Sequence, residues 1–195
     1  MNMITKGMLL SLSTMAVLGL TGCGGADAEP KPVEQAACTI EGAEAPVWVC
    51  MPDIEGSYAD VGSAALSAGG MSFSRRNALA SARSSLAQQI ETEVKDKVED
   101  FTRGTGIGTD ETVDKVSTQV TKQVAKVTLS GSKQMNFWQN PKTSTLYVLV
   151  AVPKSTVNES AKEAVKTSYK NDNALWQQFQ SKNALEALEK EFPTD

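Results

Sequence analysis

The segment from Ser74 to Arg103 constrains the fold most, because its apolar residues recur every three or four positions. This spacing predicts an amphipathic helix, since residues three and four apart share one helix face. The apolar stripe consists of Leu79, Ala82, Leu86, Ile90, Val94, Val98 and Phe101. Thirty helical residues span about 45 Å, so we expect the far end of the helix to pack against another chain or another helix.

A hairpin follows this helical part of the chain. A second helix is predicted from Asp110, and near Lys126 the pattern changes to apolar residues at every second position, up to Phe137. The turn at 139–142 and the return strand at 143–152 predict a β-hairpin. The second strand is apolar almost throughout its later half, which is typical of a central strand covered on both faces.

Shorter segments complete the predicted domain. Pro46–Pro52 is β-prone and bounded by prolines, which favours an edge strand, and Ser57–Leu66 is a second short strand. Thr156–Glu159 resembles a capping box that starts a helix through Lys170, and Ala174–Phe192 has helical spacing. Together these patterns predict an α+β fold, with a small antiparallel sheet and β-hairpin packed against long amphipathic helices.

The first 22 residues have the pattern of a secretory signal peptide. Lys6 precedes an apolar stretch that is too short for a permanent membrane span. The stretch ends in a motif that resembles the lipobox of bacterial lipoproteins, in which the cysteine is acylated and the chain is cut before it. This motif consists of Leu20, Thr21, Gly22 and Cys23. The alternative is an ordinary secretory signal with an incidental cysteine.

The predicted organisation is a signal peptide at 1–22, a lipidated flexible tether at 23–45 and a single α+β domain at 46–195. The tether is poor in bulky apolar residues, so it has little surface to bury. Cys38 and Cys50 remain once Cys23 carries lipid, and an even pair in an oxidising compartment predicts a disulfide. A metal site would need further ligands, and the spacing is not that of a C-x-x-C redox motif.

The chain has no histidine, which removes the usual general base and the commonest metal ligand. We therefore expect no enzymatic activity, no metal and no cofactor. The net charge of −4 gives no general attraction for nucleic acid. A hydrolase that uses two carboxylates is an alternative, but these residues follow the pattern of solvated helix faces. They are Glu91, Glu93, Asp96, Glu99 and Asp100.

Three arginines near the start of the long helix are candidate contacts. Arg75, Arg76 and Arg83 are suited to a phosphate, a sugar acid or a neighbouring subunit, and the alternative is that they are simply solvated. The aromatic residues allow a ligand groove as well, although roles in the core are the commoner use.

Five segments, in this order, resemble the Lpp-twenty family of bacterial outer-membrane lipoproteins. They are Pro46–Trp48, Val61–Ala64, Ala78–Ile90, Leu146–Pro153 and Leu175–Ala184. The family includes surface antigens and a flagellar-associated member that is needed for motility and assembles into envelope-anchored disks or rings. The resemblance implies no catalytic residues. The Cys38/Cys50 pair departs from the family pattern.

The leading hypothesis is a non-enzymatic lipoprotein, held at the outer membrane by lipid on Cys23, where Gly24 takes the place of an aspartate that would favour the inner membrane. Its body self-associates as a homo-oligomer or docks on envelope proteins, including those of the flagellar basal region. The alternative is a lipoprotein that binds a small ligand or peptidoglycan. A carboxylate hydrolase is the third possibility.

Overall fold

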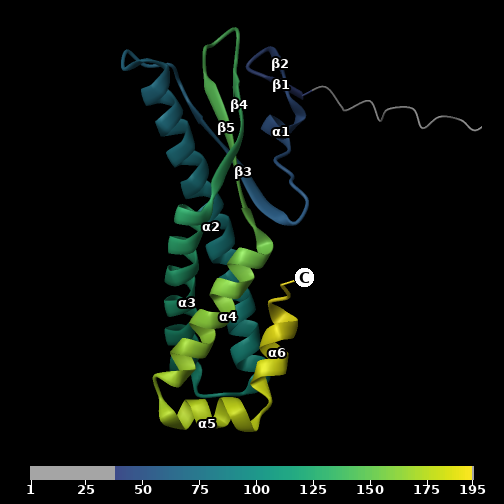
Figure 1. Cartoon of the computed structure of the whole chain (residues 1–195), viewed down its shortest axis with the longest axis vertical. Helices are drawn as coiled ribbons and strands as arrows, with labels where there is room; N and C mark the ends of the chain where they lie inside the picture. Colours follow the sequence, from purple (N-terminus) through teal and green to yellow (C-terminus); the bar gives the residue numbers. More distant parts are fainter. Residues whose placement is uncertain (1–37, 195) are drawn as a thin grey trace, which may run out of the picture. The chain divides into compact units, whose positions relative to one another are not determined.

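The computed structural model describes residues 38–194, all within the compact unit Gln35–Asp195 (Figure 1). The lipobox and Cys23 lie outside the described residues. The α+β class predicted from the sequence is confirmed. In chain order the elements are β1 (Cys38–Ile40), β2 (Ala43–Ala45), α1 (Val47–Cys50), β3 (Ser57–Ala64), α2 (Gly70–Thr105), α3 (Asp110–Gly131), β4 (Lys133–Gln139), β5 (Leu146–Pro153), α4 (Lys154–Lys170), α5 (Asn173–Ser181) and α6 (Ala184–Glu191).

Strand β5 is the centre of the main sheet, which has the antiparallel order β3-β5-β4. Both the predicted hairpin and its central strand are therefore confirmed. Alternate residues of β5, from Leu146 to Val152, enter the main core, while Tyr147 on the other face packs beside β1 and α1. Both faces of β5 are covered, which explains its nearly continuous apolar sequence.

Helix α2 packs along the sheet and then along the other helices. Its first half contacts β3 and β5, and it also packs against α3 and α6. Its far end thus has partners within the same chain, which meets the expectation of another helix. Gly106, in the left-handed region with φ 59°, ends the helix by donating its N–H to the carbonyls of Thr102 and Arg103.

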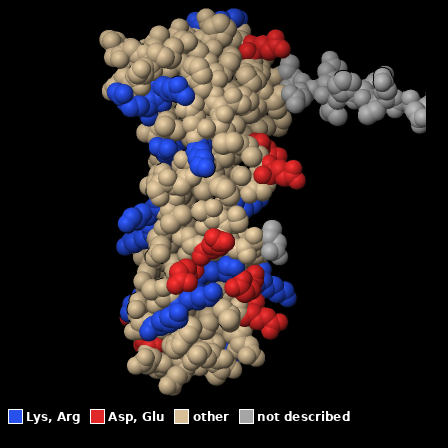
Figure 2. All heavy atoms as spheres, viewed as in Figure 1, with Lys and Arg blue, Asp and Glu red and all other residues tan. Residues whose placement is uncertain are grey.

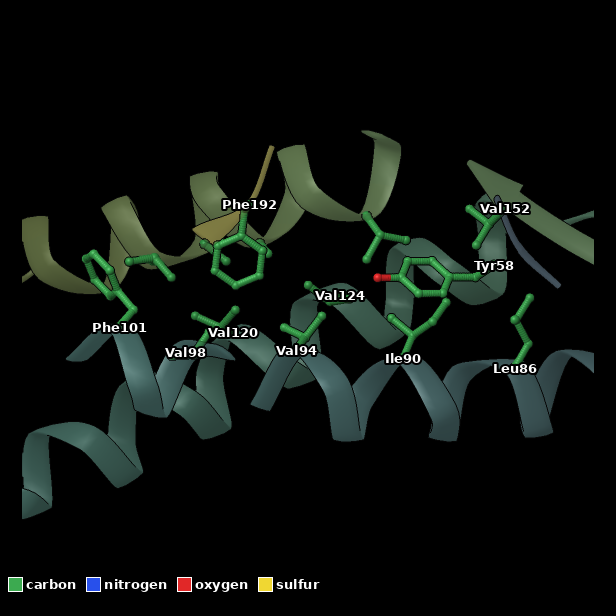
Figure 3. Close-up of a cluster of buried hydrophobic side chains, with 14 of the residues drawn as sticks. Tyr58, Leu86, Ile90, Val94, Val98, Phe101, Val120, Val124, Val152 and Phe192 are labelled. Atoms are coloured by element: carbon green, nitrogen blue, oxygen red, sulfur yellow. The ribbon is translucent and has the colours of Figure 1, made fainter. Parts of the chain in front are cut away.

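The main core forms where the stripe of α2 meets β3, β5 and the helices α3 to α6 (Figure 3). Six of the seven stripe residues are fully buried, and Leu79 is half-buried. At the far end, the ring of Phe101 lies 6.5 Å from that of Tyr169 and 6.2 Å from that of Phe179. The Tyr169 hydroxyl donates to Thr102 Oγ1 at 3.2 Å. The C-terminal helices thereby close the core around α2.

The region before β3 differs from the prediction. Val47–Cys50 is one helical turn rather than an edge strand, and the strands are Cys38–Ile40 and Ala43–Ala45, inside the range predicted as tether. The alternation of buried and exposed residues in 38–45 is that of a hairpin with one covered face. Because this face packs against the sheet, a sequence with few bulky residues is ordered here.

The end of α3 and the start of α4 also differ from the prediction. Helix α3 continues to Gly131, so the alternating pattern begins only at β4. Helix α4 begins directly after Pro153 and has no side-chain cap, so the capping box predicted at Thr156–Glu159 does not form. Pro153, with φ −59° and ψ 136°, is both the last residue of β5 and the N-cap of α4, so the helix follows the strand directly.

The last predicted helix is divided in two. Lys182 and Asn183 separate α5 from α6, and Asn183 adopts φ 52°, which asparagine tolerates better than most residues. The break turns α6 back toward α2, so that Leu188 and Phe192 are buried and Leu185 is exposed. None of the helices in residues 38–194 combines the length and apolar character that a membrane span requires.

Candidate interaction surfaces

The predicted disulfide is present, between Cys38 of β1 and Cys50 at the end of α1, with Cα atoms 6.3 Å apart. It closes the hairpin and the helical turn into one small unit. The buried residues Cys38, Ala45 and Val49 of this unit pack against Trp138 and Tyr147 on the outer face of the sheet. The pair is therefore structural, since it holds a cover over β4 and β5.

Polar contacts attach the same unit to the turn between β4 and β5. The buried Asn140 donates from Nδ2 to the carbonyl of Ile40 at 2.9 Å. Thr143 donates to the carboxylate of Glu41 at 2.5 Å, and Lys142 donates to the carbonyl of Gly42. The hairpin tip is thus joined to a turn about 100 residues later in the chain.

Two of the three candidate arginines join α2 to β4. Arg83 donates to the hydroxyl of Ser132 at 3.2 Å and to its carbonyl at 3.3 Å. Arg75 donates to Gln134 Oε1 from two nitrogens, at 3.2 and 3.0 Å, and stacks 5.4 Å from the ring centre of Phe137. Each of them uses two of its three guanidinium nitrogens in these bonds, and the structure does not gather the three arginines around one empty site.

Arg76 belongs to a cluster of exposed side chains that the sequence did not predict. It lies 6.0 Å from the ring centre of Phe73, which is 44% exposed. We call this cluster the α2-start surface; it consists of Leu66, Met71, Phe73, Arg75, Arg76 and Phe137.

The exposure of Phe137 follows from a β-bulge. The prediction placed Met135 and Phe137 on one apolar face, but the register of β4 against β5 shifts between Gln134 and Asn136. Met135 occupies the extra position and is 52% exposed. After the shift, Phe137 is paired with Val148 at the edge of the sheet and is covered only in part.

A second surface is an open groove of about 800 Å³ between α2 and α3. Leu129, 46% exposed, supplies its largest apolar side chain. Lysines outnumber acidic residues along it, and Lys95 also pairs with Glu99 of the next turn at 3.7 Å. We call it the α2–α3 groove; its lining residues are Glu91, Lys95, Thr118, Thr121, Lys122, Ala125, Lys126, Leu129 and Ser130.

Two carboxylates of α2, Glu93 and Glu99, pair with cations, and Glu93 also accepts a hydrogen bond from a tyrosine. The Tyr58 hydroxyl donates to Glu93 Oε1 at 2.7 Å, and Lys97 donates to the same oxygen at 2.8 Å. Burial favours a higher pKa for Glu93, but these hydrogen bonds and the positive charges nearby outweigh it, so its pKa is lowered overall. Burial, together with the bond to Glu93, raises the pKa of Tyr58.

These hydrogen bonds connect β3 to α2, so we interpret this group of residues as structural. Glu99 lies between Lys95 and Arg103 in the same way. Within residues 38–194, no three cysteine, aspartate or glutamate side chains converge as a metal site would need.

Comparison with known proteins supports the resemblance seen in the sequence. No curated protein matches the chain significantly. The family model described as LPP20 lipoprotein matches residues 46–153, which is more than half of the chain and runs from α1 through the end of β5. The matched part contains the whole sheet β3-β5-β4 and the two long helices. The chain therefore belongs to the LPP20 lipoprotein family.

Proposed function

We propose that this lipoprotein is a non-enzymatic scaffold of the cell envelope, held at the outer membrane by lipid on Cys23, whose folded body binds further copies of itself. Family membership supports membrane anchoring through lipid. The lipobox that ends at Cys23 supports the attachment site, and Gly24 supports the outer membrane as the destination. An acyl anchor of two or three chains would hold the protein durably.

The α2–α3 groove is the observation that carries self-association. Its lysines, Lys122 and Lys126 among them, surround the exposed Leu129. Helix α6 has the complementary character, because Leu185 is 51% exposed and is followed by the exposed Glu186. An apolar side chain flanked by opposite charge fits such a groove. We therefore propose a second copy, through its α6, as the occupant.

The groove and α6 are different surfaces of the molecule, so this contact joins copies head to tail. Such a heterologous interface repeats, and it closes into a ring or continues as a filament according to the rotation between neighbours. A scaffold built in this way needs no catalytic group.

Sedimentation velocity of the full mature chain with Cys23→Ser, which removes the lipid, tests the proposal. We expect concentration-dependent oligomers, and we expect Lys122→Glu with Lys126→Glu, or Glu186→Lys alone, to weaken them. Combining the three changes restores opposite charges and should recover much of the association. Lys133→Glu, an exposed lysine of β4, is the matched control. A strict monomer at high concentration would refute self-association.

We further propose that the protein acts at the flagellar basal region, on the basis of the family resemblance alone. Fractionation of the wild type beside Cys23→Ala tests the anchor, since the variant should leave the outer-membrane fraction. Electron cryotomography of a deletion strain should show missing density around the motor, together with impaired motility. Normal motility with unchanged motor density would refute the proposed flagellar role.

Binding of peptidoglycan fragments is the competing function, and it has less support because Arg75, Arg76 and Arg83 have separate neighbours and do not line one site. A bound ligand must raise the melting temperature by mass action. Thermal-shift measurements with muropeptides distinguish the two functions, and a dose-dependent rise would favour the competing one.

A further inference from the structure

Exposed apolar side chains gather where β3 ends and α2 begins. Leu66, Met71 and Phe73 are 43%, 40% and 44% exposed, although they lie within eight consecutive residues. Phe137 of β4, 40% exposed, is linked to the same turns through Arg75. Large apolar side chains that are exposed close together favour a place of contact over an ordinary solvated face.

The first described strand lies at this same end of the folded unit. Ala64, the last residue of β3, pairs with Leu146 just after the β4–β5 turn. That turn holds the tip of the β1–β2 hairpin through Asn140 and Ile40. Figure 1 shows the start of α2, the β4–β5 turn and the β1–β2 hairpin together at the upper end of the molecule. Cys38, the first described residue, thus belongs to the end of the folded unit that carries the α2-start surface.

The charge beside these apolar residues is positive. Arg75 and Arg76 flank Phe73 and Phe137, and Figure 2 shows basic side chains over the first turns of α2 in a region otherwise without charge. The acidic residues of this end, Glu41 and Glu44, belong to the β1–β2 hairpin. Trp138, which packs against that hairpin, follows Phe137 along the strand, so the hairpin covers the opposite face of the sheet.

We infer that the α2-start surface rests on a bilayer surface that contains acidic phospholipids. Its apolar side chains lie at the headgroup boundary, and Arg76 and the Arg75 nitrogen that does not bond Gln134 contact the phosphates. Apolar residues beside cations are what such a surface binds. The inference rests on the proposed lipid at Cys23. The fifteen residue steps from Cys23 to Cys38 span at most about 50 Å when fully extended. This maximum reach is similar to the length of the 36-residue helix α2, which is about 54 Å.

This orientation has a consequence for the rest of the body. The end of the molecule with the α2-start surface faces the lipid, while α5 and α6, at the other end of α2, point away from it. The arginines and Phe73 contribute to the same contact with the bilayer. Loss of the arginines or of Phe73 therefore weakens membrane binding.

Flotation of the full mature chain with Cys23→Ser on vesicles tests the surface without the anchor. We expect binding to phosphatidylcholine vesicles that contain phosphatidylglycerol, much weaker binding without it, and loss of binding at high salt. The paired changes Met71→Ser with Phe73→Ser, and Arg75→Gln with Arg76→Gln, should each lower the partition coefficient roughly tenfold or more. Circular dichroism confirms that each variant folds.

Two matched controls change similar residues elsewhere. Met51→Ser removes an exposed methionine that directly follows α1, and Lys115→Gln with Lys170→Gln removes two exposed cations, one on α3 and one on α4; both should bind vesicles like the parent chain. Failure of the parent chain to bind, or equal losses in the controls, would overturn the inference. Self-association and release of Cys23→Ala from the membrane are measured separately, so each proposal can fail alone.

Discussion

Gly62 lies where β3 crosses α2, and its missing side chain sets how closely the strand and the helix approach. A Cβ atom placed there would meet the backbone of Ala78 and Ala82, with Ala82 Cα only 2.7 Å away. Ala78 and Ala82 are themselves fully buried. Three small residues therefore allow backbone-to-backbone packing at this crossing, and no flexible side chain is available to move aside.

We expect Gly62→Ala to lower the free energy of unfolding by about 3 kcal/mol or more, because the helix must shift to admit one methyl group. Urea denaturation followed by circular dichroism measures the loss. Gly104→Ala is the matched control, since nothing lies within 4 Å of its added Cβ and the site is helical. It should be neutral or stabilising by up to about 1 kcal/mol. Similar losses in both variants would contradict this account of the crossing.

Glu93 gives the stability of the protein a pH dependence at the acid end. Its pKa is lower in the folded state than the ordinary value of 4.5, so its contribution is present above that pH and is lost as the pH falls through the folded pKa. Because the carboxylate is partly exposed, we expect less than about 1 kcal/mol from it.

The difference in unfolding free energy between wild type and Glu93→Gln, measured by urea denaturation from pH 6 to pH 3, isolates this contribution. The difference should shrink as the pH falls below 4.5. Glu163→Gln changes an exposed carboxylate of α4 and serves as the control. A difference for Glu93→Gln that is constant over the whole range would contradict the prediction.

At the scale of elements, the sheet has one face covered by a long helix and the other by a small disulfide-closed unit. The second cover buries little surface, since its buried residues are Cys38, Ala43, Ala45 and Val49. A chain segment of this kind depends on a constraint to remain folded against the sheet. The disulfide closes a loop of 13 residues, from Cys38 to Cys50, worth roughly 3 kcal/mol in the chain-entropy model.

Reduction of the disulfide should release the β1–β2 hairpin and α1 while the main core stays folded. Trp48 and Trp138, which are partly buried in this cluster, should then emit at longer wavelength, with little change in far-ultraviolet circular dichroism. Trp176 stacks on Phe179 in the main core, so Trp176→Phe should leave the spectral change intact. Global unfolding on reduction would show that the unit is not separate.

At the scale of the whole molecule, the family match ends at residue 153, whereas the core extends into the helices that follow. Helices α4, α5 and α6 contribute buried residues to the same cluster as α2 and β5, including Tyr169, Phe179 and Phe192. Without them, the lower half of α2 would expose Val98 and Phe101. The matched region is therefore only part of one cooperative unit.

A chain that ends at Pro153 should not fold cooperatively, because it lacks one side of its core. Size-exclusion chromatography and thermal melting should show aggregation and a broad or absent transition. Removal of only Pro193–Asp195 is the control. It keeps Phe192 but loses the hydrogen bonds of Asn158 to Pro193 and of Lys162 to Thr194, so a cooperative melt at a slightly lower temperature is expected. A cooperative melt for the shorter chain would contradict the prediction.

Regular patterns in the sequence were enough to predict the long helix, the hairpin with its central strand, and the α+β class. Each rests on a repeat along one segment, every three or four residues in 74–103 and every second residue in the hairpin. The disulfide followed from cysteine number and compartment. These features were accessible because each is encoded within a single segment or in composition.

The tertiary structure alone decided which surfaces the molecule offers. The turn at Val47–Cys50, the break at Asn183, the bulge that exposes Phe137 and the partners of Arg75 depend on contacts between distant segments. The α2–α3 groove likewise exists only once two helices pack side by side. Such contacts leave no periodic trace in a single sequence, so the scaffold and membrane surfaces proposed for this lipoprotein could be located only in three dimensions.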